Sequence, residues 1–103
     1  MEKNAAITAL GALAQETRLD VFRLLVERGP EGLPAGAIAG ALDIPAATLS
    51  FHLKALKEAG MVRRARQGRE LVYAADFPRM EALLRFLTDN CCQGACPPKA
   101  ARP

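Results

Sequence analysis

The most constraining feature of this chain is a pair of short helical segments separated by a tripeptide, Asp-Ile-Pro, at residues 43–45. The residue before a proline is disfavoured in helical backbone conformations, so the tripeptide predicts a tight connection. A helix is predicted after it, from Ala46 to Ala59. It ends at Gly60, a residue suited to the left-handed conformation that closes many helices. The segment before the tripeptide, opened by residues 33–34, is predicted to be a short helix of mostly small residues.

The two sides of the helix predicted at Ala46 to Ala59 differ in chemistry. At 100° per residue, one side carries Leu49, Leu53 and Leu56. The other side carries Ser50, Lys54 and Lys57, with Thr48 and Phe51 at its margin. One face therefore packs, and the other is suited to contact phosphates and base edges. This arrangement is typical of a helix-turn-helix, whose second helix enters the major groove of DNA.

The hydrophobic period then changes from helical to alternating. Residues 62–66 and 71–74 flank the tetrapeptide at 67–70, which predicts a β-hairpin with Gly68 at its turn. A hairpin directly after a recognition helix is a wing, and Arg64, Arg66 and Arg69 can contact a phosphate strand or a minor groove. The expected fold class is mainly α with a β-hairpin wing, a homodimeric winged helix-turn-helix.

Positive charge is concentrated in the same region. The formal net charge is +3, and residues 44–72 hold six basic residues against two acidic ones, while the rest of the chain is about neutral. A local basic stripe on a near-neutral body is expected where a protein binds a polyanion such as DNA. A basic surface that is merely solvated is the alternative that charge alone leaves open.

Apolar residues recur at helical spacing near both ends of the chain. They are Ile7, Leu10, Leu13 and Ala14 in the first predicted helix, and Met80, Leu83, Leu84 and Leu87 in the last, which begins at residues 76–78. Together they exceed what a small domain must bury internally. The sequence therefore predicts a dimer interface containing Ile7, Leu10, Leu83, Leu84 and Leu87. A two-fold dimer would present two recognition helices to half-sites about one helical turn apart.

All three cysteines, Cys91, Cys92 and Cys96, lie within six positions after the last predicted helix. An odd number bunched at one end does not form a disulfide framework, so reduced thiols are expected. Thiolates select soft thiophilic ions over magnesium or calcium. Residues 1–90 are thus predicted to form a DNA-binding and dimerisation domain, and residues 91–103 a cysteine-containing tail. An incidental thiol-rich tail, or a redox switch, is the alternative.

The chain resembles the ArsR/SmtB repressors, winged-helix dimers that leave DNA on binding metal or metalloid ions. One part of the resemblance is residues 16–19 leading into residues 22–25. A second is Thr48 to Val62, which is similar to the family's Ser-x-His-Leu recognition helix, and a third is Arg66 to Arg69 followed by Tyr73, which is similar to its wing. The resemblance covers nearly all of residues 10–87.

The resemblance implies a sensing site in the tail. Some arsenic sensors of the family carry cysteines in the third helix, where Ile38 to Ile44 has none, and its zinc sensors use histidines that the last predicted helix lacks. The tail is similar to that of arsenic sensors in which an adjacent cysteine pair and a third cysteine follow the last helix. Trivalent arsenic and antimony take three thiolates in a pyramid, whereas zinc prefers four ligands.

The function implied is a transcriptional repressor released from double-stranded operator DNA by As(III), Sb(III) or methylarsenite. A regulator that responds to thiol oxidation, or to cadmium, lead or zinc, is the alternative, and a metal-trafficking or buffering protein without operator preference is a third class. No required cofactor is expected. Paired carboxylates, a P-loop and a zinc-protease motif are missing from the sequence, so an enzyme is not expected.

His52, the only histidine, lies toward the packed side of the predicted recognition helix, which favours a structural role over a metal-binding or catalytic one. The full set of residues predicted to carry DNA binding is Thr48, Ser50, Phe51, His52, Lys54, Lys57, Arg64, Arg66 and Arg69. No stretch approaches the 18 or so apolar residues that would span a bilayer, and the N-terminal residues lack a secretory signal. A cytoplasmic location without a membrane partner is expected.

Overall fold

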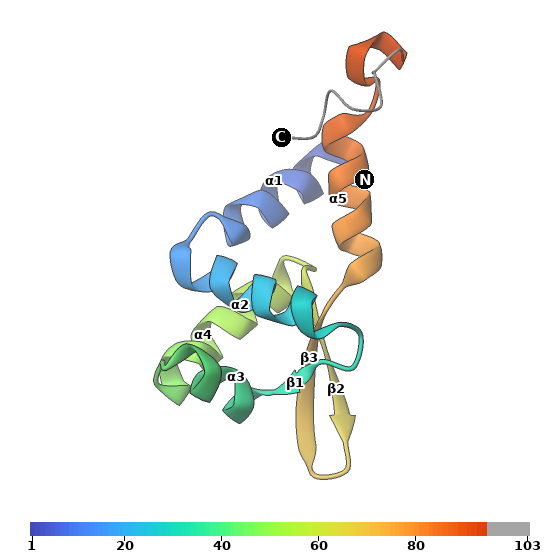
Figure 1. Ribbon diagram of the computed structural model, residues 1–103. Coiled ribbons are helices and arrows are strands. Elements are labelled where there is room, and N and C mark those ends of the chain that lie inside the picture. The colour runs from blue at the N-terminus through green and yellow to red at the C-terminus, as the bar shows by residue number, and fades with distance from the viewer. Residues whose placement is uncertain (95–103) are drawn as a thin grey trace.

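The computed structural model describes residues 1–94. Of the residues predicted to have a function, Cys96 lies outside this range. The elements run in the order α1 (Lys3–Leu13), α2 (Glu16–Arg28), β1 (Leu33–Pro34), α3 (Ala35–Leu42), α4 (Ala46–Glu58), β2 (Val62–Gln67), β3 (Glu70–Ala75), α5 (Phe77–Thr88) and a 3₁₀ turn (Cys91–Gly94) (Figure 1). The predicted fold class, mainly α with a β-hairpin, is confirmed.

The core lies where α2, α3 and α4 meet beside the sheet (Figure 1). Its largest fully buried side chains are Val21, Leu25, Ile38, Leu49, Leu53, Leu56 and Met61. Three of these leucines come from one side of α4, as the helical spacing predicts. Their burial fixes the rotation of α4 about its own axis, and so decides which residues face outward.

The connection between α3 and α4 is as tight as the sequence predicts. Asp43 closes α3 in a left-handed conformation, with φ 54°, and the Ile44 amide donates to the Ala39 carbonyl at 3.1 Å. Pro45 precedes the first residue of α4 in an extended conformation. The two helices bend by 113° at this break, which lies within the range of about 90–120° typical of a helix-turn-helix. At its other end, α4 is followed by Gly60 in the left-handed region, with φ 82°.

The sheet is antiparallel, with strand order β1-β3-β2. The hairpin turns at Gly68, with φ 64°, as the sequence predicts. Strand β1 was not predicted, since its two residues, Leu33 and Pro34, were assigned to the opening of a helix. They pair instead with Tyr73 and Val72 of β3, and α3 begins only at Ala35. A strand of two residues is too short to produce the alternation by which strands are recognised.

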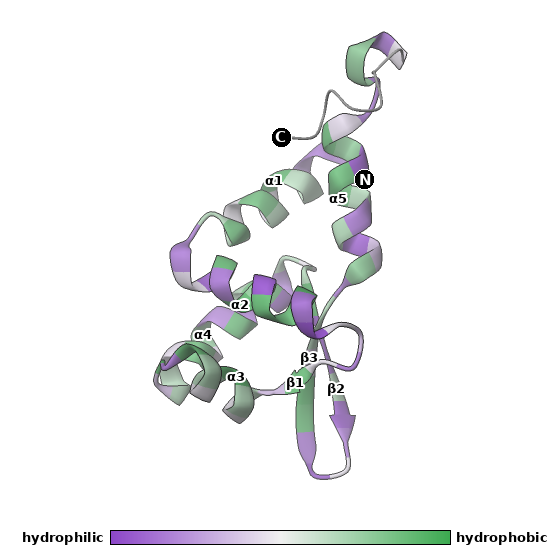
Figure 2. Cartoon of the chain, in the orientation of Figure 1, coloured by the Kyte–Doolittle hydropathy of each residue, from purple (hydrophilic) through white to green (hydrophobic). Residues whose placement is uncertain are grey.

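Each of the helices α1 and α5 buries some of its apolar residues within the chain and leaves other large apolar residues exposed. In α1, Ala6 and Ala9 are buried while Ile7 is 59% exposed. In α5, Leu83 is buried within the chain, whereas Leu84 and Leu87 are 55% and 53% exposed. Apolar residues on both helices are visible in Figure 2, in contrast to the hydrophilic end of the hairpin. The exposed apolar surface of α1 and α5 thus includes Leu84 and Leu87 but excludes Leu83, and we call it the terminal apolar face. Its large members are Ile7, Leu10, Leu84 and Leu87.

Among residues 1–94, no single helix is long and apolar enough to cross a membrane, and only the bent pair α3 and α4 satisfies length and composition together.

Candidate nucleic-acid interface and cysteine pair

Helix α4 presents a polar and basic face away from the core. Ser50, Lys54 and Lys57 are exposed, while Leu49 and Leu53 beneath them are buried. The N-terminal half of the helix also exposes Thr48 and Phe51. The predicted division of this helix into a packed side and an outward side is therefore confirmed.

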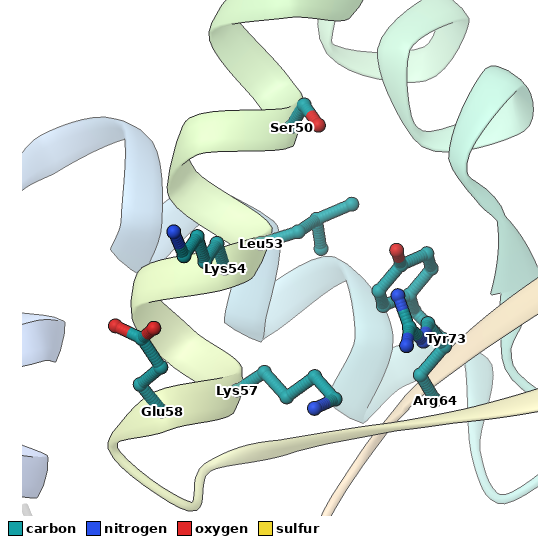
Figure 3. A pocket seen from close by; sticks show the side chains of 7 residues that line it. All are labelled: Ser50, Leu53, Lys54, Lys57, Glu58, Arg64 and Tyr73. Carbon is teal, nitrogen blue, oxygen red and sulfur yellow. The ribbon is translucent and has the colours of Figure 1, made fainter.

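A hollow of about 340 Å³ lies between α4 and the hairpin. We call it the basic hollow, and its lining residues are Ser50, Leu53, Lys54, Lys57, Glu58, Arg64 and Tyr73 (Figure 3). Lys57 extends from α4 on the side of the hairpin, where Arg64 and Tyr73 lie together (Figure 3). Arg64 and Tyr73 are direct cross-strand partners in the antiparallel register, which places both side chains on the same face of the sheet.

The basic hollow holds three cationic side chains and one carboxylate. Neither ion pair in the described part of the chain involves them, because one joins Arg23 to Glu27 and the other joins Arg28 to Glu31. Lys54, Lys57 and Arg64 thus keep their charges for an external anion. Lysine and arginine side chains grouped in this way are suited to contact phosphate oxygens.

The rest of the hairpin adds to this basic surface. Arg63, Arg66 and Arg69 are all exposed, and the hairpin projects away from the body of the molecule (Figure 1). Glycine at the turn leaves open space, since a Cβ built at Gly68 meets no atom within 4 Å. The space around the tip of the hairpin is therefore open.

His52 is the one member of the predicted DNA-contacting set that does not lie on the exposed face. It is 8% exposed, and Nη1 of Arg18 lies 3.5 Å from its Nδ1. Arg18 also donates from Nε to the Ala12 carbonyl at 2.8 Å. Burial lowers the pKa of His52 below its ordinary value, and the positive charge of Arg18 lowers this pKa further. A neutral imidazole that accepts from Arg18 links α4 to α2, as expected for a structural histidine.

The other predicted DNA-contacting residues all lie on the outside of the chain. They are Thr48, Ser50, Phe51, Lys54, Lys57, Arg64, Arg66 and Arg69. Four of the residues that line the basic hollow belong to this set. Tyr73, which also lines it, was absent from the predicted set. Its alternation with buried Val72 and Ala74 along β3 indicates that its side chain lies on the other face of the sheet. Its approach to α4, however, depends on tertiary packing.

Two of the three cysteines lie in the described part of the chain, just after α5. Cys91 and Cys92 are exposed in the turn that follows Thr88, and their Sγ atoms are 3.6 Å apart. Between residues 1 and 94 there is no group of three or more His, Cys, Asp or Glu side chains arranged to hold a metal ion. The adjacent thiols can share a soft ion as two of its ligands.

The chain has relatives among known regulators. Residues 13–65, which run from the end of α1 into β2, match the family model described as a helix-turn-helix domain. The chain is 28% identical over 95 residues to the transcriptional activator HlyU of Vibrio cholerae serotype O1 (strain ATCC 39315 / El Tor Inaba N16961), covering 90% of this chain and 85% of that protein.

The chain is also similar to solved structures of transcriptional regulators. An ArsR-like transcriptional regulator from Rhodococcus sp. RHA1 superposes with a TM-score of 0.73 and 27% identity, covering 82% of this chain and 76% of that one. A homodimeric winged helix-turn-helix DNA-binding domain from Mycobacterium bovis, a possible ArsR-family transcriptional regulator, has a TM-score of 0.66 and 30% identity. The shares covered are 84% of this chain and 81% of that one.

Proposed function

The chain belongs to the ArsR family of helix-turn-helix transcriptional regulators, and on that premise we propose that it is a homodimeric repressor released from operator DNA by trivalent arsenic. Arsenite is the proposed inducer, and antimonite and methylarsenite share its trivalent, thiophilic chemistry. Its ligands are the thiolates of Cys91, Cys92 and Cys96. The basic surface of α4 and the hairpin is the proposed DNA contact.

The DNA contact is supported by the exposed face of α4. Ser50 and Lys54 project from a helix whose opposite side is locked into the core, so the face has a fixed orientation. The three unneutralised cations of the basic hollow supply charge for phosphates on the side of the hairpin. Phosphate contacts set the position of a protein on the duplex, and contacts to base edges set its sequence preference.

The homodimer is supported by the terminal apolar face. Leu84 and Leu87 on α5, with Ile7 on α1, form an exposed apolar surface. Monomeric proteins rarely expose such surfaces, which often mark contacts with another protein. The Mycobacterium bovis neighbour is itself described as homodimeric. A two-fold pairing through this face would set the distance between the two copies of α4.

The observation that supports a thiophilic ion as the inducer is the 3.6 Å separation of the Cys91 and Cys92 Sγ atoms, while the choice of arsenic over zinc rests on three thiols without a nearby histidine in the sequence. Two thiolates on one soft ion, each about 2.3 Å from it at a tetrahedral angle, lie about 3.8 Å apart. The pair is thus already close to the spacing that a shared ion requires. Cys96 would supply the third thiolate of a pyramidal site, although it lies outside the described residues.

Thiol oxidation is the second candidate signal, and the adjacent pair argues against its simplest form. Neighbouring Cα atoms are about 3.8 Å apart across a trans peptide, whereas disulfides usually span Cα separations of about 4.4–6.8 Å. A disulfide between Cys91 and Cys92 would therefore be strained, so oxidation would act instead through a disulfide to Cys96 or to a second copy of the chain, or by forming a sulfenic acid. A shared ion needs no such distortion.

A titration of the operator-bound protein separates these signals. Arsenite, antimonite, zinc, cadmium and hydrogen peroxide are added in turn, and the fraction of bound DNA is followed by fluorescence anisotropy. Release by arsenite and antimonite at concentrations well below those of zinc is expected. Release by peroxide alone would replace the metalloid sensor with a redox regulator, and the absence of operator binding would refute the DNA-binding function itself.

A further inference from the structure

Phe51 is the most exposed of the large apolar side chains in the described part of the chain, at 67%. The next most exposed, Ile7, Leu84 and Leu87, belong to the terminal apolar face on α1 and α5. Phe51 lies on α4 instead, among polar and basic residues. Its exposure therefore calls for a partner different from the one that covers the terminal apolar face.

Phe51 lies at the margin of the face that carries Ser50, Lys54 and Lys57, and on the side of α4 turned most directly away from the core. The buried leucines of this helix, Leu49, Leu53 and Leu56, occupy the opposite side at 100° per residue. The exposed residues one turn earlier are Ala47 and Thr48, whose side chains are too small to cover the ring. Phe51 is the sixth residue of α4, in the N-terminal half that reads base edges in helix-turn-helix proteins.

The ring of Phe51 contacts the ring of its neighbour. Its centroid lies 5.4 Å from that of the His52 ring, and the two planes meet at 71°, an edge-to-face arrangement. His52 is itself buried and in contact with Arg18. An aromatic ring that contacts a fixed neighbour loses less side-chain freedom on binding, so it is a suitable contact for a specific partner.

We propose that Phe51 is a specificity-determining residue that recognises thymine through the C5-methyl group in the major groove. This inference rests on the proposed DNA-binding function and adds a base preference to it. The donors and acceptors of the base edges suit Ser50 and Lys54, whereas the thymine methyl is the apolar group that the major groove offers to an aromatic side chain. The operator half-site therefore contains a thymine opposite Phe51.

The basic character of the surrounding face favours DNA over a protein as the partner of this ring. Ser50 and Lys54 lie on the adjoining face of α4, and both line the basic hollow. An apolar protein surface placed there would bury the ammonium group of Lys54. A DNA duplex instead brings phosphates to the lysine and a methyl group to the ring.

The test removes the methyl group alone. Operator sequences are selected from random duplex DNA with the full chain, and each thymine of the selected half-site is then replaced by uracil, which lacks only the C5-methyl. Dissociation constants are measured for the unmodified protein, for Phe51→Ala and for Leu19→Ala. Leu19 is an exposed apolar residue of α2, outside the proposed DNA contact, and serves as the control.

Uracil at one position of one half-site is expected to weaken binding of the unmodified protein about fourfold, which corresponds to roughly 0.8 kcal/mol for one methyl-sized contact. The same replacement should leave the affinity of Phe51→Ala unchanged, while Leu19→Ala retains the fourfold effect. If no position behaves in this way although the protein selects a defined operator, the thymine inference is overturned and DNA binding stands. If no sequence is selected, both fail.

Photocrosslinking provides a second measurement that does not depend on the affinity of the variant. 5-Bromouracil carries a bromine where thymine carries its methyl, so it preserves the proposed contact and crosslinks on irradiation. At the sensitive position, the crosslinked peptide is expected to contain Phe51. A crosslink confined to another element would overturn the proposal.

Discussion

The surroundings of Gly32 and of His52 strictly limit substitution at both positions. Gly32 is buried with φ +70°, and a Cβ there would lie against the Tyr73 carbonyl, 2.9 Å from its carbon. This close approach allows β1 to pair with β3. His52, in contrast, is limited by charge, because burial and Arg18 both disfavour its protonated form.

Gly32→Ala is expected to destabilise the protein by more than about 1 kcal/mol, since it adds a backbone clash to an unfavourable left-handed conformation. Gly68→Ala is the matched control, because its φ of +64° is similar but its Cβ meets no atom within 4 Å. Urea unfolding monitored by circular dichroism measures both. Equal losses in the two variants would show that the contact with Tyr73 has no energetic weight.

The lowered pKa of His52 predicts a pH dependence of stability. As pH falls through the ordinary histidine value of about 6.5, the unfolded chain takes up a proton that the folded chain still excludes, so the free energy of unfolding decreases. Above this range the contribution of His52 to the pH dependence vanishes. His52→Asn, which retains a group able to accept from Arg18, should flatten the curve between about pH 7.5 and 5.5. Because the chain has one histidine, an unchanged slope would contradict the assignment.

At the scale of elements, the sequence predicts those whose pattern is local. Leucines at helical spacing predict α4 within one residue of its observed end, and Gly68 predicts the hairpin turn. Strand β1 escapes prediction because its pairing partner lies about 40 residues away, at Tyr73. The outward face of α4 is predictable for the same local reason. The contribution of Tyr73 to the basic hollow is not, because it depends on how the hairpin packs against α4.

Helix α4 and the hairpin, which form the proposed DNA contact, can be tested by the same measurement. Lys54→Ala on α4 and Arg66→Ala on the hairpin should each weaken operator binding and reduce the slope of log K against log salt by about one unit per lost phosphate contact. Arg23→Ala removes the same charge from α2, where the side chain pairs with Glu27, and should leave the slope unchanged. Slopes unaltered in all three variants would mean that the contact surface lies elsewhere.

At the scale of the whole molecule, the proposed site and the proposed interface adjoin. Cys91 and Cys92 follow α5, which ends at Thr88 and carries Leu84 and Leu87 of the terminal apolar face. An ion bound at the tail is therefore placed to change the position of α5, and with it the distance between two recognition helices. By linkage, an ion that weakens DNA binding binds less tightly to the DNA-bound form, with a typical coupling of about 1–3 kcal/mol.

The dimer is tested by placing charge on the terminal apolar face. Leu84→Glu or Leu87→Glu should dissociate the dimer, because a carboxylate would be buried there without a partner, and operator binding should be lost with it. Light scattering gives the mass of each variant. Leu19→Glu, at an exposed apolar position of α2, is expected to remain dimeric. A Leu84→Glu variant that stays dimeric would place the interface on another surface.

The central claim is that thiolates of the tail couple arsenite to DNA release. Its most direct test is an arsenite titration of the operator complex, made with the unmodified protein and with Cys91→Ser, Cys92→Ser and Cys96→Ser combined. The account predicts that both proteins bind the operator with similar affinity, since Cys91 and Cys92 lie after α5 and apart from α4 and the hairpin, and that arsenite releases only the unmodified protein. Release of the triple variant at the same low arsenite concentration would contradict it.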